Sequence, residues 1–327
     1  MDERVIFLRK KIDGENSIEG YAQRVAEATG AIIKVCPCHS TTIRGMLKNI
    51  KFAKKEQGKI NHIAAQTESY LVPFLRNKSI VTFHDLGTLY SSRNFLYKIL
   101  KTLIYIKTAE FFSNVISFVS NQTLYEFKKQ SWKKNINLKV IYNSYDERLV
   151  PNDISEKETK PVILQIGTGA RKNLESTIKA MRGINAKLLV IGKLTELQIS
   201  LLKENDVDFE NEFDVSYEEI VNCYNRAKIV AFPTFYEGFG LPIIEANAMC
   251  KPVVSSELQI IREVGNDSVF YINPNDIASI KNSFEKLLFD KNTYNNFVSK
   301  GTENAKRFSP VTIYEQYREL YRSLENG

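Results

Sequence analysis

Short apolar runs recur along the whole chain, and stretches with helical periodicity separate them. This alternation constrains the fold most strongly, because strands that alternate with helices form parallel βαβ units. Six runs lie in each half of the sequence: 5–8, 31–35, 60–64, 80–83, 115–119 and 138–142, then 162–166, 188–191, 208–210, 229–232, 253–255 and 269–272. The sequence therefore predicts an α/β protein with two doubly wound parallel sheets.

The length of the chain supports the same division. At 327 residues it is too long for one typical core and suits two domains. The segment 143–161 is polar and contains prolines, and it lacks periodicity, so we expect it to be the linker. We predict Rossmann-like domains over 1–145 and 160–309. After Asp276 the sequence reads as helix to its end, and Ser309 suits the N-cap of a terminal helix over 310–327.

The positive charge of the chain belongs to its first half. Residues 1–150 carry 24 Lys and Arg against 13 Asp and Glu, a net charge of +11, whereas the remainder carries 21 against 25, a net charge of −4. Such asymmetry suits an anionic membrane, a phosphorylated acceptor or nucleic acid. No helix-turn-helix, RNP-type or zinc-finger pattern accompanies it, which argues against nucleic acid. Unselected surface lysine is the alternative explanation.

The sequence shows no membrane-spanning or secretory segment. No apolar run approaches the roughly 20 residues that cross a bilayer, and the N-terminus has charges on both sides of a strand-length run instead of a signal peptide. We therefore expect a cytoplasmic protein, with the inner membrane face as a candidate surface for peripheral binding.

Residues Pro233 to Met249 place a strand end, a glycine turn and a helix start between two carboxylates. Gly238 and Gly240 allow a tight turn and close approach of a ligand, and a proline directly after Leu241 fits the first turn of a helix. The amides of such a helix start favour phosphate or sugar oxygens. Two carboxylates with a row of amides suit a sugar nucleotide, because the carboxylates accept hydrogen bonds from hydroxyls and the amides donate them to phosphate.

The spacing of Glu237 and Glu245 around Gly-Phe-Gly-Leu-Pro resembles the glutamate-pair motif of the retaining GT-B glycosyltransferases of family four, the glycosyl transferases group 1. The resemblance spans the whole chain, although the second domain carries most of it and the first is short for the family. It implies a GT-B fold, in which two facing Rossmann-like domains enclose an interdomain cleft. The first domain would bind the acceptor and the second the nucleotide-sugar donor, and the terminal helix would cross back onto the first domain.

The resemblance implies roles for residues of the second domain. Glu237 and the segment Gly238, Phe239, Gly240 and Leu241 would bind the donor sugar, and Glu245 would accept from the ribose hydroxyls. Lys172 matches the family lysine that contacts the donor diphosphate. Many relatives carry an arginine where this chain has Thr168. Either Arg171 takes over the role of that arginine at the donor diphosphate, or the diphosphate has one cation fewer. Cations there would stabilise the departing diphosphate.

Two further candidates lie in the first domain. His84 ends a strand and resembles the family histidine that reaches the donor sugar near its reacting carbon, where a neutral imidazole can donate to a hydroxyl. Asp85 would orient it or contact the acceptor. Gly20 belongs to a loop that resembles the family's glycine loop beside donor phosphate, although the usual paired glycines are absent. We therefore assign His84, Lys172 and Glu237 to catalysis and Gly20 to donor binding.

The segment 91–112 mixes aliphatic and aromatic residues with Arg and Lys. This composition suits a helix in a membrane interface, and packing against the sheet is the alternative.

The sequence and the resemblance together predict a retaining hexosyltransferase that acts on a glycan or lipid-linked acceptor in surface polysaccharide or lipooligosaccharide assembly. We expect no cofactor besides the nucleotide-diphosphate sugar as co-substrate, and no metal, because no strand ends in Asp-x-Asp. The alternatives are a GT-B sugar-nucleotide epimerase and a non-catalytic partner of a transferase complex. A nicotinamide dehydrogenase is disfavoured, because neither first βα turn contains Gly-x-Gly-x-x-Gly.

Overall fold

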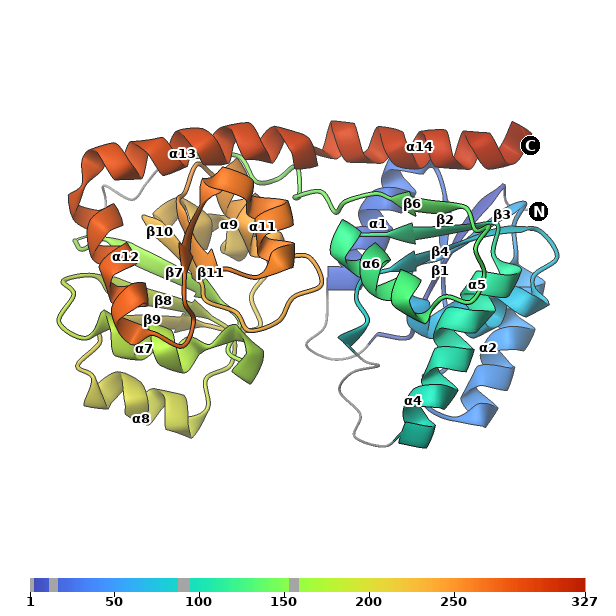
Figure 1. Cartoon of the computed structure of the whole chain (residues 1–327), viewed down its shortest axis with the longest axis horizontal. Coiled ribbons are helices and arrows are strands. Elements are labelled where there is room, and N and C mark those ends of the chain that lie inside the picture. The colour runs from blue at the N-terminus through green and yellow to red at the C-terminus, as the bar shows by residue number, and fades with distance from the viewer. Residues whose placement is uncertain (1–2, 12–16, 88–94, 153–158, 327) are drawn as a thin grey trace. The chain divides into compact units, whose positions relative to one another are not determined.

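A computed structural model of the chain describes residues 3–11, 17–87, 95–152 and 159–326 (Figure 1). The chain divides into two compact units, one formed by residues 1–143 and 311–327 and the other by residues 144–310. Within the described ranges each unit contains one sheet of six strands, and the strand pairs there are all parallel. The predicted fold class, two doubly wound parallel sheets with alternating helices, is confirmed.

The first unit has the strand order β2-β1-β3-β4-β5-β6. The chain order therefore reverses between β1 and β3. In sequence its elements are β1 (Arg4–Leu8), α1 (Ser17–Thr29), β2 (Ile32–Val35), α2 (Ile43–Glu56), β3 (Ile60–Ile63), η1 (Gln66–Phe74), β4 (Lys78–Phe83), α4 (Phe95–Lys101), the π-helical turn η2 (Thr102–Lys107), α5 (Thr108–Phe112), β5 (Val115–Phe118), α6 (Asn121–Gln130), β6 (Leu138–Val140) and α14 (Pro310–Asn326).

The second unit has the order β12-β11-β10-β7-β8-β9, which reverses between β7 and β10. Its elements are β7 (Val162–Ile166), η4 (Ala170–Lys172), α7 (Leu174–Met181), β8 (Lys187–Ile191), α8 (Glu196–Glu204), β9 (Phe209–Glu212), α9 (Tyr217–Arg226), β10 (Ile229–Phe232), α10 (Leu241–Ala248), β11 (Val253–Ser256), α11 (Gln259–Gly265), η5 (Asn266–Ser268), β12 (Val269–Ile272), α12 (Ile277–Phe289), α13 (Lys291–Ala305) and η6 (Lys306–Phe308).

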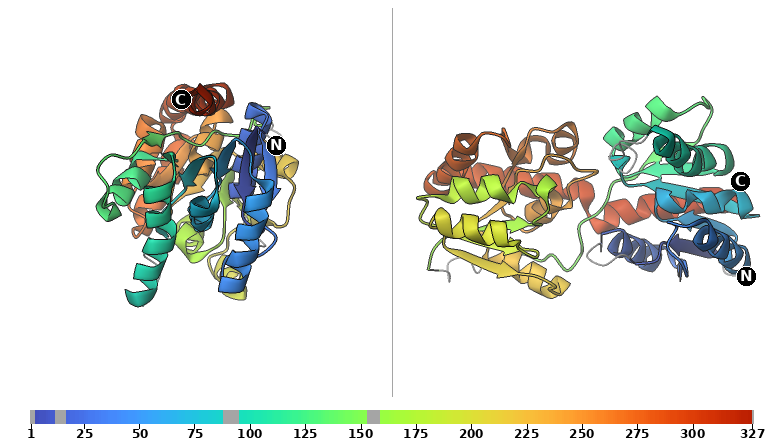
Figure 2. Two further views of the ribbon diagram at one scale, coloured as in Figure 1. Left: turned by 90° about the vertical axis from the view of Figure 1, so that its right-hand side faces the viewer. Right: turned by 90° about the horizontal axis from the view of Figure 1, so that it is seen from below.

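Each of the twelve predicted strand runs forms or overlaps a strand. Their apolar side chains fill cores on both faces of a sheet, and helices cover both faces in each unit (Figures 1 and 2). In the first unit, α1 and α14 cover one face, where Tyr21, Tyr317 and Tyr321 are buried. The other face packs against α2, η1, η2, α5 and α6.

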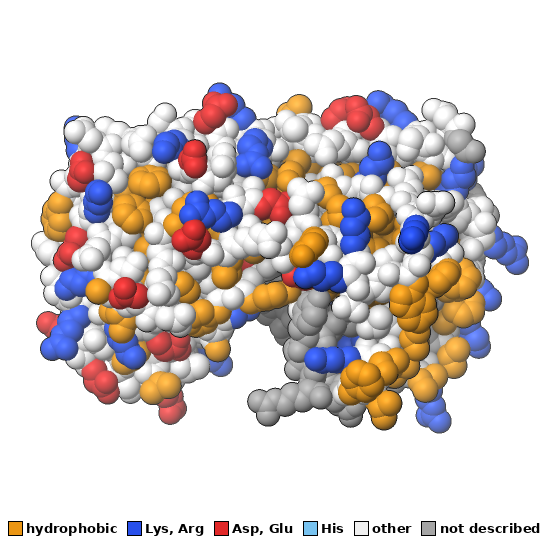
Figure 3. Space-filling view, in the orientation of Figure 1, with side chains coloured by type: hydrophobic (Ala, Val, Ile, Leu, Met, Phe, Trp, Pro, Cys, Tyr) orange, Lys and Arg blue, Asp and Glu red, His pale blue; other side chains and the backbone are white. Residues whose placement is uncertain are grey.

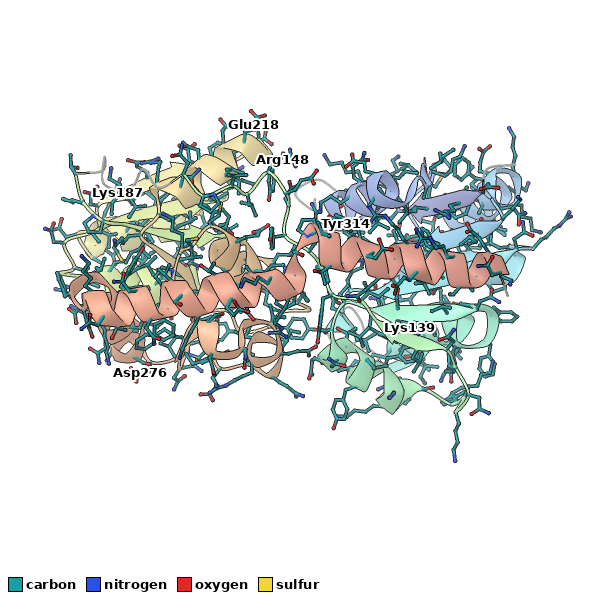
Figure 4. All side chains as sticks on the ribbon, turned by 90° about the horizontal axis from the view of Figure 1, so that it is seen from above. Lys139, Arg148, Lys187, Glu218, Asp276 and Tyr314 are labelled. Atoms are coloured by element: carbon teal, nitrogen blue, oxygen red, sulfur yellow. The ribbon has the colours of Figure 1, made fainter. Side chains whose placement is uncertain are left out.

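The C-terminal region is helical, as predicted, but it is broken into separate helices. Asp290 ends α12 and caps α13, since its Oδ1 accepts from the amides of Asn292 and Thr293 at 3.0 and 3.1 Å. A second break follows Phe308, and α14 begins at Pro310 as expected. In the view of Figure 4, Tyr314 lies on α14, and it packs partly buried against the core of the first unit.

The predicted helix over 91–112 is described from Phe95 onward, so residues 91–94 lie outside the described part. None of the residues of α4, all of which are described, is buried. The following turns do bury Ile106, Lys107, Ala109 and Glu110. The segment therefore packs on the domain through its second half, whereas its first half exposes its apolar side chains.

Candidate functional site

The switch point of the second sheet brings together the residues that the sequence singled out there. In open α/β sheets, ligands bind beyond the carboxyl ends of the strands where the strand order reverses. In this sheet the reversal lies between β7 and β10, which pair directly. Lys172 follows β7 and Glu237 follows β10, so the topology alone predicts that the two side chains can meet.

Lys172 and Glu237 form an ion pair, with 2.6 Å between Nζ and Oε1. Their side chains are only 16% and 8% exposed, so the pair is largely removed from water. Burial lowers the pKa of Lys172 below its usual value, although the charge of Glu237 opposes this effect. The Lys172 ammonium also lies 4.6 Å from the centre of the Phe232 ring.

The turn after β7 is shaped around the lysine side chain. Gly167 has φ +94°, a left-handed conformation, and a Cβ there would lie 3.0 Å from Cγ of Lys172. Lys172 ends a 3-10 turn, and Asn173 continues in a left-handed conformation at φ 57°. A glycine at position 167 therefore leaves the space in which Lys172 lies, a requirement that the sequence did not reveal.

Thr234 ties the two strand ends to each other. Its hydroxyl lies 3.0 Å from Oε1 of Glu237 and 2.9 Å from the carbonyl oxygen of Arg171, and the amide of Phe235 donates to the same carbonyl at 2.8 Å. The Arg171 side chain itself is exposed. Thr234 is part of the sequence motif, but only the structure shows that it fixes the position of Glu237.

The second glutamate also has a buried partner. The hydroxyl of Tyr224 on α9 donates to Oε2 of Glu245 at 2.8 Å, and Tyr224 is fully buried. Burial raises the pKa of Tyr224 well above its usual value, and the charge of Glu245 adds to this effect. The phenol therefore stays protonated and holds Oε2 of Glu245. Nothing in the spacing of α9 predicted this contact.

The predicted glycine turn lies between the two glutamates. Gly240 has φ +99° and precedes α10, which starts at Leu241 with Pro242 in its first turn. A Cβ on Gly240 would meet Ile261 and Ile243 at 3.2 and 3.3 Å, so both space and conformation require glycine. Phe239 is buried and packs edge-on against Phe308 at 5.8 Å between ring centres. Gly238 and Phe239 thus connect Glu237 to the helix start as predicted.

His84 follows β4 in the first unit and is partly buried. Its Nε2 lies 2.8 Å from the carbonyl oxygen of Ala64, which can only accept, so Nε2 carries the proton. Burial lowers the pKa of His84, which keeps the ring neutral at pH 7 and leaves Nδ1 as an acceptor. The predicted contact of His84 with a sugar hydroxyl would therefore use Nδ1, as the acceptor of the hydrogen bond.

The surroundings of His84 include two residues that the sequence did not single out for it. The Tyr21 ring packs edge-on against the imidazole, with 4.9 Å between ring centres. Gln66 accepts from the amide of His84 at 3.3 Å and donates to the carbonyl of Asp85 at 2.8 Å. The Asp85 carboxylate accepts from the amide of Gly87 instead of orienting the imidazole.

Gly20 is not a loop glycine. It lies inside α1, next to Tyr21, and a Cβ there would meet Nη1 of Arg24 at 3.2 Å. The preceding residues 12–16, which include the start of the predicted glycine loop, lie outside the described part of the chain. The structure thus brings Gly20 near His84 through Tyr21, whereas the remaining predicted site residues belong to the second unit.

A cation stacks on an aromatic ring at the start of α9. The guanidinium of Arg148 lies 4.2 Å from the centre of the Tyr217 ring, beside Glu218 at the start of α9 (Figure 4). Among the described residues, no three His, Cys, Asp or Glu side chains gather in a group that could hold a metal ion. No described helix has the length and apolar character that a bilayer crossing requires.

Comparison with known proteins places the chain among glycosyltransferases. Residues 146–304 match the model of the family described as glycosyl transferases group 1. Over 250 residues the chain is 29% identical to the O-antigen chain mannosyltransferase RfbU of Salmonella typhimurium. The match covers 72% of this chain and 68% of RfbU. It is 31% identical over 152 residues to the capsular polysaccharide biosynthesis glycosyltransferase CapM of Staphylococcus aureus, covering 44% of this chain but only 39% of CapM.

Solved structures share the fold of the whole chain. A sucrose-phosphate synthase from Thermosynechococcus elongatus superposes with a TM-score of 0.82 at 17% identity, covering 99% of this chain and 100% of that one. Anabaena Alr3699/HepE, solved with UDP-glucose, gives a TM-score of 0.81 at 17% identity, covering 98% and 99%. With the family match, these likenesses confirm the resemblance drawn from the glutamate motif. The chain therefore has the GT-B fold, and its residues 146–304 are similar to the glycosyl transferases group 1.

Proposed function

We propose that this protein is a retaining glycosyltransferase that moves a hexose from a nucleotide-diphosphate sugar to a glycan or lipid-linked acceptor. The Lys172–Glu237 pair at the switch point of the second sheet carries the proposal, because it places a cation for diphosphate and a carboxylate for sugar hydroxyls side by side. The names of RfbU and CapM support a setting in surface polysaccharide assembly, and that of RfbU favours mannose among the hexoses.

The proposed reaction breaks the bond between the anomeric carbon and the diphosphate oxygen. The acceptor hydroxyl forms its new bond on the same face, and its proton passes to an oxygen of the leaving diphosphate. Lys172 and Arg171 stabilise the charge that develops on the diphosphate. Glu237 holds the sugar hydroxyls, Glu245 holds the ribose, and Nδ1 of His84 accepts from a sugar hydroxyl. These cations replace a metal in the proposed mechanism.

Calorimetry with nucleotide-diphosphate sugars tests the donor site. We expect Lys172→Ala and Glu245→Ala each to weaken donor binding by about ten-fold or more, the loss expected for a charge-assisted contact. Lys187→Ala is the matched control, since it removes a 2.5 Å ion pair with Glu210 in the same sheet. Unchanged donor binding in both site variants would show that the assigned donor site is wrong.

A screen of uridine, guanosine and thymidine diphosphate sugars by thermal shift would identify the donor. Incubation of the wild-type protein with that donor and no acceptor then separates the alternatives. A change in the sugar's configuration, followed by NMR, would indicate an epimerase. A protein that binds no donor would suit a non-catalytic partner instead.

We also propose that the first unit binds an anionic membrane surface. Its basic charge and the exposed apolar residues of α4 support this, because a surface of both kinds suits the headgroup region of a bilayer. Vesicles with anionic lipid should sediment the protein at low salt and release it as the salt concentration rises. If neutral vesicles sediment it equally well, the charge asymmetry is not a membrane signal.

A further inference from the structure

The first unit contains a cavity of about 350 Å³ at its own switch point, between β1 and β3. Arg9 and Lys10 follow β1, and Thr67 and Glu68 follow β3, so residues beyond the carboxyl ends of both strands line it. Lys101 at the end of α4 lines it from another side. This is the position at which an open α/β sheet binds a ligand, and the proposed donor site does not use it.

The polar part of the cavity favours an anion. Cationic side chains reach it from two elements, with Arg9 and Lys10 after β1 and Lys101 on α4. Arg9 also pairs with Glu19 at 3.2 Å, and the Lys101 ammonium lies 4.6 Å from the Tyr97 ring centre. The hydroxyls of Ser40, Thr41 and Thr42, which lead into α2, add donors.

Glu68 does not cancel this positive charge. Its carboxyl is buried and accepts hydrogen bonds from the hydroxyls of Ser40 and Thr67. Burial raises the pKa of Glu68 to about 7, so a large share of the carboxyl is protonated at neutral pH. An anion that enters the cavity therefore meets a partly neutral acid beneath the cations.

The apolar part of the cavity continues onto the outer surface. Leu100, Tyr97 and Ile104 line the cavity and belong to α4 and η2. On the same helix Phe95 and Leu96 are 73% and 75% exposed. Hydrophobic side chains gather over α4 in Figure 3, with Lys and Arg side chains among them.

The neighbouring start of α2 extends this apolar surface. Ile43, which also lines the cavity, is 78% exposed, and Leu47 one turn later is 55% exposed. Contiguous apolar patches of this kind mark binding sites on soluble proteins. The apolar surface and the cationic cavity therefore share one edge.

We propose that this cavity binds the phosphate head of a lipid-linked acceptor and that the acceptor's apolar chain leaves over α4 and the start of α2. The volume lies near the lower end for ligand pockets, so it holds the head and the first few carbons but not a long chain. The rest of the chain then covers the exposed side chains of α4. This inference rests on the proposed function, because it names the acceptor class of that reaction.

Three small probes test the two parts of the ligand separately: geranyl phosphate, geraniol, which lacks the charge, and inorganic phosphate, which lacks the chain. In calorimetry with the full chain, geranyl phosphate should bind at least about ten-fold more tightly than either of the others. Equal affinity for geranyl phosphate and inorganic phosphate would overturn the proposal. So would sedimentation with anionic vesicles without any preference for geranyl phosphate, since the surface would then bind membrane only.

Matched variants locate the site. Lys101→Ala should weaken geranyl phosphate binding by about ten-fold, because it removes a cation from the cavity. Lys129→Ala is the control, because the Lys129 ammonium also lies over a tyrosine ring, 4.2 Å from the ring centre of Tyr125, but on helix α6. Leu100→Asp should weaken binding of geranyl phosphate as well, whereas Leu197→Asp, at another exposed leucine on α8, should not. Equal effects in site and control variants would contradict the assignment.

The two proposals can fail independently. Donor binding in the second unit is measured on the same samples and should be unchanged by Lys101→Ala and Leu100→Asp. If no nucleotide-diphosphate sugar binds the wild type, the proposed function fails. If a donor binds but geranyl phosphate shows no preference over geraniol and inorganic phosphate, only the acceptor inference fails.

Discussion

At the scale of single residues, the site depends on a partly desolvated ion pair whose geometry is fixed by neighbours. Lys172 and Glu237 pair with each other, and the hydroxyl of Thr234 contacts the same carboxylate oxygen, Oε1. A buried charge that loses its partner is strongly destabilising, so the pair also protects the fold before the donor binds. Residues that shape this pair should therefore matter for donor binding even where they do not touch the donor.

Gly167 and Gly169 provide a matched test of that idea. Gly167→Ala forces a side chain into the left-handed region and against Lys172, whereas a Cβ on Gly169 would meet nothing within 4 Å. We expect Gly167→Ala to weaken donor binding in calorimetry by about ten-fold, since the strain and the clash displace the lysine. Gly169→Ala should be nearly neutral. Similar losses in both variants would show that the loop, and not the space for Lys172, is what matters.

Tyr224 is predicted to position Glu245. Tyr224→Phe keeps the buried ring but removes the hydrogen bond to Oε2, so the carboxylate loses a contact that positions it. We expect a loss of affinity of a few-fold for a nucleoside diphosphate and a smaller loss for its 2′,3′-dideoxy analogue, which lacks the ribose hydroxyls. Calorimetry with both ligands measures this difference. A variant that weakens both ligands equally would point to a purely structural role for Tyr224.

At the scale of elements, the sequence predicts strands better than it predicts the positions of polar contacts. Apolar runs such as Ile229–Phe232 mark buried strands, because a parallel sheet is covered on both faces. Helix boundaries were harder to predict. The helical periodicity continues across Asp290, although this residue ends α12 and caps α13. Gly20 was misplaced in a loop, since glycine usually marks a turn but is tolerated in α1.

The candidate site was predictable where it lies in one continuous motif or at a strand end. Lys172, Glu237 and Glu245 fall there, and the sheet order explains how Lys172 and Glu237 meet. Tyr224 and the cavity around Glu68 depend on contacts between distant elements, which no local pattern records. Side chains that support a site are thus harder to predict than those that carry its motif.

Glu68 on η1 makes the stability of the first unit depend on pH. The unfolded carboxyl releases its proton near pH 4.5, whereas the folded one retains it to about pH 7. Between these values the folded state binds more protons, so stability falls as the pH rises, by up to on the order of 3 kcal/mol. Ser40 and Thr67 donate to the carboxyl, and the charge of Arg9 opposes the shift while that of Glu19 adds to it.

Glu68→Gln should remove this dependence. The wild type should lose thermal stability between pH 5 and pH 8 as Glu68 releases its proton. The variant has no proton to lose at this position, so its stability relative to the wild type should be higher at pH 8 than at pH 5. Thermal unfolding of both proteins at the two pH values measures the difference. A constant difference between variant and wild type at pH 5 and pH 8 would show that Glu68 does not titrate across this range.

At the scale of the whole molecule, each unit has its own sheet and core, and the chain returns to the first unit through α14. The hydroxyl of Tyr21 donates to Tyr317 at 2.7 Å, and Tyr321 pairs with Nδ1 of His62 at 2.7 Å. Burial lowers the pKa of His62 to about 3, so the imidazole is neutral within this network. The terminal helix therefore completes the core of the first unit, although it is last in the sequence.

Tyr317→Ala should for this reason destabilise the first unit selectively. Tyr317 is fully buried, so its truncation leaves a cavity, removes the hydrogen bond to Tyr21 and should cost about 3–5 kcal/mol. In scanning calorimetry we expect an early transition from the first unit and a later one from the second. A nucleotide-diphosphate sugar, most of whose proposed contacts lie in the second unit, should raise the later transition more than the early one. Tyr125→Ala, at an exposed tyrosine of α6, serves as the control and should shift neither transition appreciably. A single transition that moves as a whole in Tyr317→Ala would instead mean that the two units unfold as one cooperative body, with α14 stabilising both.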